Sequence, residues 1–404
     1  MSITTDKTVG PCRLLHHFTD NELITVRILI DAGSGQDPAN HYGTAHYMEH
    51  MFFKGTEDKT YKEMNKIISR IGDANAYTCE SRTVYYINCL AEDYEKAVDI
   101  LFEMLTRPRF DPEEFNREKG VILEEVQSGL DSPQAYFGDE FGRAIFGDKK
   151  GHNTAGTKNS VQEMKLSDLI EFRKKYYNYI TWIVVGKVNS TRAAAKIKNL
   201  EFPKLSVTPN NSLDGLDGLI YLKNHHLYHA SKQAALAMVT KGLPATDIPG
   251  SGILSVLLNA MGGGMHSLMF DRIREELGLC YSINTVSQSY ARVGAIVTVC
   301  WLDESCLPRA KNEIIKIMDD IKKAGIPEDL LELAKKNYII NMLQNTQKSS
   351  SYALEVLDPY YSQGRKITSY EKEKKQVLAV TNKDIIEFAR RYFDKKCFVI
   401  MTEK

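Results

Sequence analysis

The chain has 404 residues, with 52 Lys and Arg against 52 Asp and Glu and a 43% share of hydrophobic residues. This length exceeds what one hydrophobic core normally supports, so we expect two domains, and the composition excludes a disordered or fibrous protein. The zero net charge excludes recruitment of nucleic acid or an anionic membrane by bulk electrostatics. We therefore expect neither as a partner, and recognition must depend on a specific site.

The seven cysteines form no C-x-x-C pair, and an odd number argues against a disulfide framework or a zinc ribbon. The N-terminal residues show neither the apolar core of a signal peptide nor an Arg-rich presequence. No stretch reaches the apolar length of a membrane span. These features predict reduced thiols and a cytoplasmic protein.

The first elements alternate between strands and helices. A strand at Val26–Gly33 is broken by a Gly-Ser-Gly turn, and a helix follows from about Gly43. Thr60 and Glu63 form a capping box that opens an amphipathic helix ending at Gly72. The pattern then predicts a strand at Thr83–Leu90.

Two further helices follow in this half. Apolar residues on one face predict a helix at Asp93–Leu105, and Asp111 with Pro112 starts another that runs to Gly129. The second half repeats the mixed order and includes a long helical stretch from about Pro327 to Leu354. The pattern is typical of an α+β fold.

The two halves resemble each other. The run DLIEFRKKYY at Asp168–Tyr177 returns as DIIEFARRYF at Asp384–Phe393, and a β-rich run follows each copy. The repeat predicts two similar duplicated domains, each a mostly antiparallel sheet packed with helices. Polar turn residues concentrate in Asn199–Gly218, which places the domains at residues 1–205 and 206–404.

The residues with the clearest chemistry are His46-Tyr47-Met48-Glu49-His50. On a helix, His46 and His50 are one turn apart on one face, as two ligands of a single Zn²⁺ ion require. Glu49 lies beside them, where it could take a proton from a metal-bound water without being a ligand. The pattern H-x-x-E-H is typical of a group of zinc peptidases.

Zinc needs a third protein ligand, and the helix from Asp111 offers two glutamates on one face. Glu118 and Glu125 are seven residues apart, whereas Glu124 points elsewhere. Glu125 is the candidate ligand, and Glu118 suits an orienting or proton-handling role. The alternative is that both are solvated, as most helix glutamates are, because spacing cannot bring this helix to the histidines.

Several runs carry a resemblance to a known family. These are GSGQDP, GTAHYMEHMFFKGT, IGDANAYTCESRTVYY and FNREKGVILEEV in the first half, with GGGMHSLMFDRIREELGLCYS in the second. Together they resemble the pitrilysin and insulin-degrading-enzyme family of metallopeptidases. The similarity looks strongest to its short branch, which includes mitochondrial processing peptidase and bacterial relatives.

The resemblance implies a zinc endopeptidase whose two similar domains face each other as a clamshell around a chamber. By position, His46, His50 and Glu125 match the ligands of one Zn²⁺ per chain, Glu49 matches the general base, and Glu118 matches an accessory glutamate. The second domain would hold no metal.

Five further residues are assigned by the same resemblance. Asn75 and Ala76 match an edge strand to which substrate adds as a β-strand, and Glu80 matches a glutamate that orients a zinc-bound histidine. Arg274 and Tyr281 match a pair that reaches substrate and stabilises a developing oxyanion. Without the resemblance, Arg274 would be read as a helix-end arginine and Tyr281 as a half-buried strand residue.

The leading hypothesis is an endopeptidase that cleaves peptides or flexible polypeptide segments, with water activated by Glu49. The alternative is a non-catalytic scaffold or regulatory subunit of a processing-peptidase-like complex. The chain has half the length of the four-unit members of the family, so we expect a homodimer or pairing with a paralogue.

Overall fold

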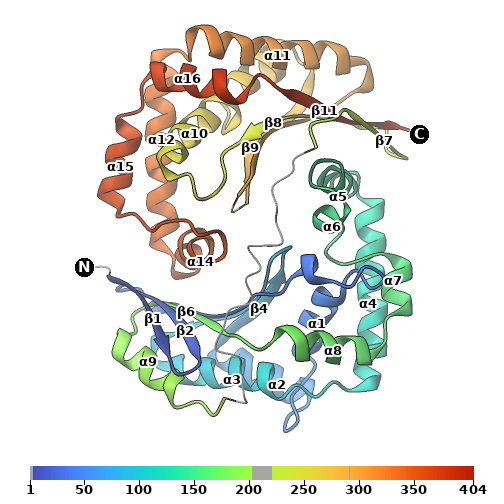
Figure 1. Cartoon of the computed structure of the whole chain (residues 1–404), viewed down its shortest axis with the longest axis vertical. Coiled ribbons are helices and arrows are strands. Elements are labelled where there is room, and N and C mark those ends of the chain that lie inside the picture. Colours follow the sequence, from blue (N-terminus) through green and yellow to red (C-terminus); the bar gives the residue numbers. More distant parts are fainter. Residues whose placement is uncertain (1–2, 203–220, 291) are drawn as a thin grey trace. The chain divides into compact units, whose positions relative to one another are not determined.

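The computed structural model describes residues 3–202, 221–290 and 292–404, and it divides the chain into two compact units (Figure 1). The first unit is made of residues 1–131, 152–215 and 345–358, and the second of residues 132–151, 216–344 and 359–404. Each unit therefore includes a segment from the other half of the sequence. The predicted boundary at residues 205 and 206 lies outside the described residues.

The first unit contains a six-stranded sheet in the order β1-β2-β6-β3-β5-β4. Only the β2–β6 pair is parallel. Its strands are β1 (Ile3–Val9), β2 (Cys12–Phe18), β3 (Leu23–Ile30), β4 (Gly72–Thr78), β5 (Thr83–Leu90) and β6 (Thr181–Gly186). Its main helices are α1 (Thr44–Phe52), α2 (Tyr61–Ile71), α3 (Tyr94–Thr106), α4 (Pro112–Asp131), α7 (Lys158–Glu163), α8 (Leu166–Tyr176) and α9 (Ser190–Lys198).

The second unit contains a five-stranded sheet in the order β7-β11-β8-β10-β9, in which only the β11–β7 pair is parallel. Its strands are β7 (His225–His229), β8 (Ala234–Gly242), β9 (Cys280–Ser289), β10 (Gly294–Leu302) and β11 (Lys396–Glu403). Its helical elements are α5 (Pro133–Phe146), α6 (Asp148–Gly151), α10 (Ile248–Gly262), the π-helix at Phe270–Glu276, α11 (Leu307–Ala324), α15 (Tyr370–Leu378) and α16 (Asn382–Tyr392), with most of α12 (Glu328–Gln347) and of α14 (Asp358–Gln363). The last residues of α12 and the first residue of α14, Asp358, belong to the first unit.

The two sheets share one topology, which confirms the predicted α+β fold with two similar halves. The order β2-β6-β3-β5-β4 matches β7-β11-β8-β10-β9 strand for strand, including the position of the parallel pair. The repeated helices α8 and α16 precede the equivalent strands β6 and β11. The first sheet differs by one added edge strand, β1.

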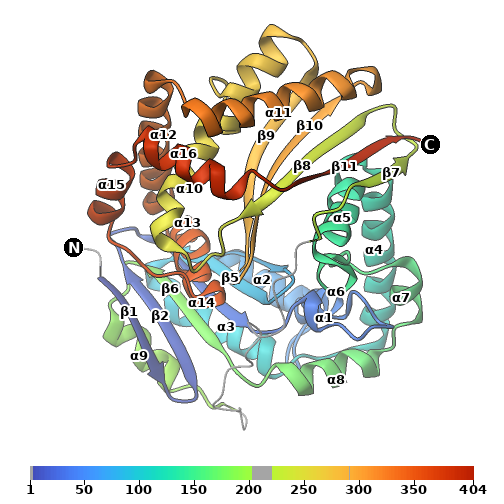
Figure 2. The same ribbon diagram turned by 45° about the horizontal axis from the view of Figure 1, so that its top comes forward.

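Each sheet is covered on both faces. In the second unit, α10, α11 and α16 pack with the core on one face, and α5 contacts β7 and β11 on the other (Figures 1 and 2). In the first unit, a large core lies between the sheet and helices α1 to α4. The opposite face is covered by α13 (Ser349–Tyr352) and the π-helix at Ala353–Leu357, which contact β3 and β6.

The long helical stretch predicted at residues 327–354 is interrupted in the structure. Helix α12 ends at Gln347, and Lys348 has extended backbone angles. The chain then joins the first unit, where the Ser349 hydroxyl donates to the Leu23 carbonyl at 2.8 Å. The predicted stretch is otherwise helical, and the break depends on contacts with a distant strand. No helix among the described residues is long and apolar enough to cross a bilayer.

Candidate metal centre and active site

Helix α1 carries two imidazoles one turn apart. His46 and His50 leave the same face, and their ring centroids lie 4.6 Å apart. The helix starts at Gly43, whose φ of 95° lies in the left-handed region that favours glycine. The buried Asp37 carboxylate accepts hydrogen bonds from the backbone N–H of Gly43 at 2.7 Å and of Ala45 at 2.9 Å. These contacts fix the start of the helix and the direction of its side chains.

Helix α4 packs directly against α1. The Tyr47 hydroxyl donates to the Phe115 carbonyl at 2.5 Å, and the two rings stack with centroids 4.7 Å apart. The predicted cap of α4 is also present, because Asp111 accepts from the backbone N–H of Glu113 at 2.8 Å. This packing places the glutamate-bearing face of α4 beside the two histidines.

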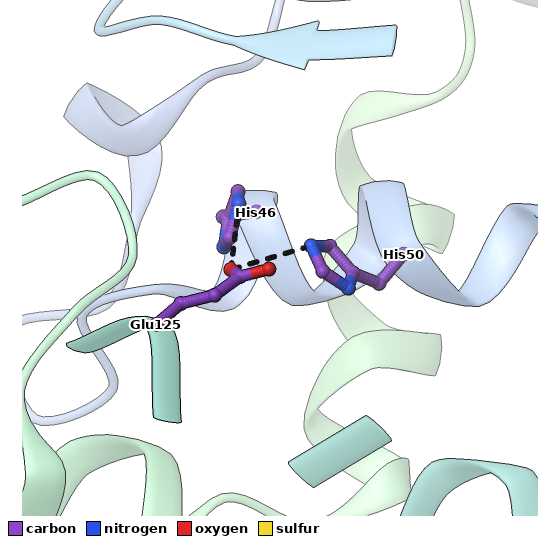
Figure 3. Close-up of side chains that lie close together, drawn as sticks. All are labelled: His46, His50 and Glu125. Atoms are coloured by element: carbon purple, nitrogen blue, oxygen red, sulfur yellow. Dashed lines mark ion pairs between the residues drawn. The ribbon is translucent and has the colours of Figure 1, made fainter. Parts of the chain in front are cut away.

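Three side chains converge at this contact (Figure 3). Donor atoms of His46, His50 and Glu125 all lie within 4.8 Å of one another. Glu125 Oε2 is 3.8 Å from His46 Nε2 and 3.7 Å from His50 Nε2. Figure 3 shows the Glu125 carboxylate between the two imidazole rings. Because these separations exceed a hydrogen bond, the three groups point at a common centre rather than bond directly.

The donor set and its spacing fit a zinc ion. Tetrahedral zinc with bonds of about 2.0–2.1 Å separates its ligand atoms by roughly 3.4 Å, close to the two measured separations. Two histidines and one glutamate leave one coordination position open. The Glu125 side chain is 45% exposed, so this side of the cluster is open to solvent.

The electrostatics of the cluster also favour a cation. Burial and the neighbouring His50 lower the pKa of His46 to about 4, which keeps this ring in the neutral form that binds metals. Burial alone would lower the pKa of His50, but Glu118, Glu125 and Glu49 outweigh it and raise this pKa. Three carboxylates thus surround the histidine pair.

Glu118 orients one of the two rings. It is 4% exposed, and its Oε2 lies 3.0 Å from His50 Nδ1. Its Oε1 contacts Lys54 Nζ at 2.5 Å. Burial acts to raise the pKa of Glu118, but the contacts with His50 and Lys54 outweigh it and lower this pKa. A charged Glu118 holds Nδ1 of His50 and leaves Nε2 directed toward Glu125.

Glu49 is buried on the same helix and is held by strand β4. It is 9% exposed, and its Oε2 accepts a short hydrogen bond from the Thr78 hydroxyl. Burial raises the pKa of Glu49, and the Thr78 hydrogen bond and the charge of His50 offset only part of this effect. The carboxylate is therefore fixed beside the metal cluster with an increased affinity for a proton.

The orienting role assigned to Glu80 stays a prediction. Nδ1 of His46 is buried without a hydrogen-bond partner among the described residues, and Nδ1 of His50 contacts Glu118. The Glu80 backbone carbonyl accepts from the N–H of Gly35 at 2.7 Å. For His50, a contact of the orienting kind is made by Glu118.

Asn75 and Ala76 lie on β4, the edge strand next to β5. The backbone N–H of Ala76 donates to the Asn75 side-chain oxygen at 2.8 Å in an exposed position. This amide is therefore satisfied locally at the open edge of the sheet.

Arg274 and Tyr281 lie in the second unit and are both exposed. Arg274 is in the π-helix at Phe270–Glu276, where its guanidinium lies 4.6 Å from the centre of the Phe270 ring. Tyr281 is on β9 and is 48% exposed. Both side chains have donors that are accessible to a ligand.

Two side chains that contact the candidate site were not singled out by the sequence analysis. Lys54 lies beyond the end of α1, and only the packed structure shows that its ammonium group reaches Glu118. Thr78 follows the assigned residues Asn75 and Ala76, but only the packed structure shows that its hydroxyl reaches Glu49.

Two family models match consecutive parts of the chain. The model described as insulinase, peptidase family M16, matches residues 14–158, which include all three metal-cluster residues. The model described as peptidase M16 inactive domain matches residues 163–338. When the two halves are superposed in sequence with an offset of 206 residues (252 − 46), His46, Glu49 and His50 correspond to Gly252, Ser255 and Val256 in α10.

Similar proteins and structures extend over most of the chain. It is 26% identical to a protein of Rickettsia bellii named an uncharacterized zinc protease, with 92% of this chain and 90% of that protein covered. A Bacillus subtilis protein with a similar name is 27% identical over 81% of this chain and 80% of its own length.

A crystal structure of a protease from Helicobacter pylori shares this fold, with a TM-score of 0.88, 20% identity and complete coverage of both chains. A Pseudomonas fluorescens structure titled peptidase M16 inactive domain has the same TM-score, with 17% identity and coverage of 99% and 98%. The family predicted from the motifs is confirmed: the chain belongs to peptidase family M16, the insulinase family.

Proposed function

We propose that the protein is a zinc-dependent endopeptidase that hydrolyses peptides or flexible polypeptide segments. The observation that carries this proposal is the convergence of His46, His50 and Glu125 around one centre, with Glu49 held beside it. Relatives named zinc proteases support the same chemistry.

His46, His50 and Glu125 would hold the ion through one atom each. A bound zinc would polarise a substrate carbonyl and lower the pKa of water. Glu118 keeps the His50 ring in place through Nδ1, and Lys54 balances the charge of that buried carboxylate. We therefore assign Glu118 an orienting role.

Glu49 is the proposed general base. Thr78 fixes Oε2 of the carboxylate, so Oε1 is the atom that we assign to accept a proton from the attacking water. Burial raises the pKa of Glu49, which favours proton acceptance by this carboxylate.

The edge strand β4 is the proposed substrate-binding strand. An extended peptide would pair with its open edge and replace the local bond between Ala76 N–H and the Asn75 side chain. Such pairing recognises the main chain, which suits a peptidase with varied substrates. In the second unit, Arg274 and Tyr281 would supply donors for substrate and for the developing oxyanion.

A Glu49→Gln substitution tests this proposal directly. The variant keeps the shape of the side chain but cannot accept the proton, so we expect wild-type zinc content and a loss of peptide turnover of about 100-fold or more. Peptide hydrolysis and metal content should be measured on the same preparation, with chelator and zinc re-addition as controls. Full turnover in the variant would exclude this role of Glu49.

The non-catalytic scaffold remains the alternative, and metal binding separates it from an enzyme. A purified chain that takes up no stoichiometric zinc would favour the scaffold. Self-association as a homodimer, or pairing with a paralogue, is a further proposal that rests on chain length. Light scattering at working concentration tests it, and a monomer would contradict the homodimer.

A further inference from the structure

A buried charged cluster joins the first sheet to the segment that covers it. Asp358 is 1% exposed and belongs to the covering segment 345–358. Its Oδ2 accepts hydrogen bonds from the Tyr77 hydroxyl at 2.5 Å and from Arg82 Nη2 at 2.9 Å. Its Oδ1 lies 2.6 Å from Arg82 Nε. A buried pair with this geometry is sensitive to the loss of either partner, because the other charge is then left without compensation.

The same strand end also contacts the general base. Tyr77 and Thr78 are the last two residues of β4, and successive side chains of a strand point to opposite faces. Tyr77 contacts Asp358 on the covered face, whereas Thr78 contacts Glu49 on the face of α1. The end of β4 is therefore held from both faces, by Asp358 of the covering segment and by Glu49 of α1.

The loop that follows β4 gives a second connection to α1. The carbonyls of Cys79 and Glu80 accept from the backbone N–H of Ser34 at 3.0 Å and of Gly35 at 2.7 Å. A Cβ on Gly33 would lie 2.0 Å from the Cys79 carbonyl oxygen, so only glycine permits this approach. Asp37, in the same turn as Gly35, caps α1. Arg82 therefore lies at the end of a loop whose backbone is hydrogen-bonded to the turn that precedes α1.

We propose that Asp358 is a positioning residue for the active site, which it serves through Tyr77, Arg82 and the end of β4. Asp358 does not contact the metal cluster; it fixes the strand that presents the Thr78 hydroxyl to Glu49. The second half of the sequence thereby contributes to the geometry of the first-half site. This inference rests on the proposed peptidase function.

The kinetic test compares Asp358→Asn with Asp358→Glu and a matched control. Asp358→Asn removes the charge and should lower kcat about 10- to 100-fold with a smaller change in KM, because a small displacement of a catalytic group is costly. Asp358→Glu keeps the charge and should retain more of the wild-type kcat. Zinc content should stay at the wild-type level in both variants.

Glu103→Gln is the matched control. Glu103 is a largely buried carboxylate of the same unit that contacts Lys59 and Thr56, each at 2.6 Å. Its loss removes a comparable ion pair that has no contact with β4, so kcat should not change. An equal fall of kcat in Glu103→Gln and Asp358→Asn would show general destabilisation and overturn the positioning role.

A second readout does not depend on activity. In metal-free protein, amide hydrogen exchange of residues 72–82 should accelerate in Asp358→Asn and in Tyr77→Phe, but not in Glu103→Gln. Tyr77→Phe removes only one hydroxyl, so it carries the test if Asp358→Asn does not fold. Unchanged exchange in these residues would overturn the inference. A wild-type chain that cleaves no peptide would instead refute the proposed function and leave the exchange result as an independent test.

Discussion

The two related sheets are covered in chemically different ways. In the second unit, Phe137 and Phe141 of α5 pack on an apolar surface that includes Ala235, Val239 and Val399. In the first unit, the covering segment has apolar contacts but also buried polar anchors. Tyr352 stacks on His17, and Asp358 binds the end of β4.

The cover with polar anchors lies on the unit that contains the candidate metal cluster of His46, His50 and Glu125. An apolar cover gains stability from burial and tolerates side chains of similar shape. A cover anchored by hydrogen bonds and charges requires particular partners, because an unpaired polar group in the core is costly. The cover that requires particular partners lies on the first sheet, whose edge strand β4 contacts Glu49.

The largest expected effect is on the apolar cover. Phe141 is 5% exposed, and Phe141→Ala should lower the free energy of unfolding of the second unit by about 3–5 kcal/mol through lost burial and a cavity. Phe141→Leu should have a clearly smaller effect. Urea unfolding measures both. An effect of Phe141→Ala below about 1 kcal/mol would contradict a cover stabilised by apolar burial.

The polar cover should instead depend on pH. Burial and the nearby His16 lower the pKa of His17 from 6.5 to about 4, and its ring accepts from or donates to the Thr4 hydroxyl at 2.6 Å. Between these pH values the unfolded chain binds more protons than the folded chain, so stability falls as the pH falls from about 6.5 to about 4.

The lowered pKa of His17 corresponds to roughly 3 kcal/mol of stability across this window. Unfolding free energies of wild type and His17→Gln at several pH values measure the effect, because glutamine keeps a polar contact but does not titrate. Parallel pH curves for the two proteins would contradict the assignment to His17.

The smallest expected change in stability concerns the N-caps of the repeated helices α8 and α16. In each helix, an aspartate in the first turn accepts a hydrogen bond from the backbone N–H of the N-cap residue. Asp168 accepts from Lys165 at 2.7 Å, and Asp384 accepts from Thr381 at 2.8 Å. Only in α16 does the N-cap side chain also accept a hydrogen bond: the Thr381 hydroxyl oxygen accepts from the Asp384 N–H at 3.3 Å. Thr381→Ala should therefore lower stability by about 1 kcal/mol, and Lys165→Thr should raise it by a similar amount. Thermal unfolding of both variants measures this, and a loss in Lys165→Thr would show that the helices are not equivalent.

Local patterns predicted much of the fold. The strand at Thr83–Leu90 has the predicted bounds, and the capping box at Thr60 and Glu63 opens α2. The internal repeat predicted the shared sheet topology because duplicated sequences preserve element order.

Contacts between distant residues could not be predicted from spacing. The sequence left open whether α4 approaches the histidines, because that depends on Tyr47 and Phe115 meeting across 68 residues. The break at Lys348 and the contact of Asp358 with β4 have the same origin. The roles of Arg274 and Tyr281, the homodimer and the cytoplasmic location stay predictions.

We propose that His46, His50 and Glu125, all in the first half of the sequence, form a zinc site. The most direct test is the zinc content per chain of wild type, Glu125→Gln and Glu124→Gln after dialysis against a fixed free-zinc concentration. Glu124 is the adjacent exposed carboxylate, so its variant matches the change in charge. We predict one zinc per chain in wild type and Glu124→Gln, and a strongly reduced content in Glu125→Gln. Equal zinc content in the two variants, or none in wild type, would contradict a zinc site at these three residues.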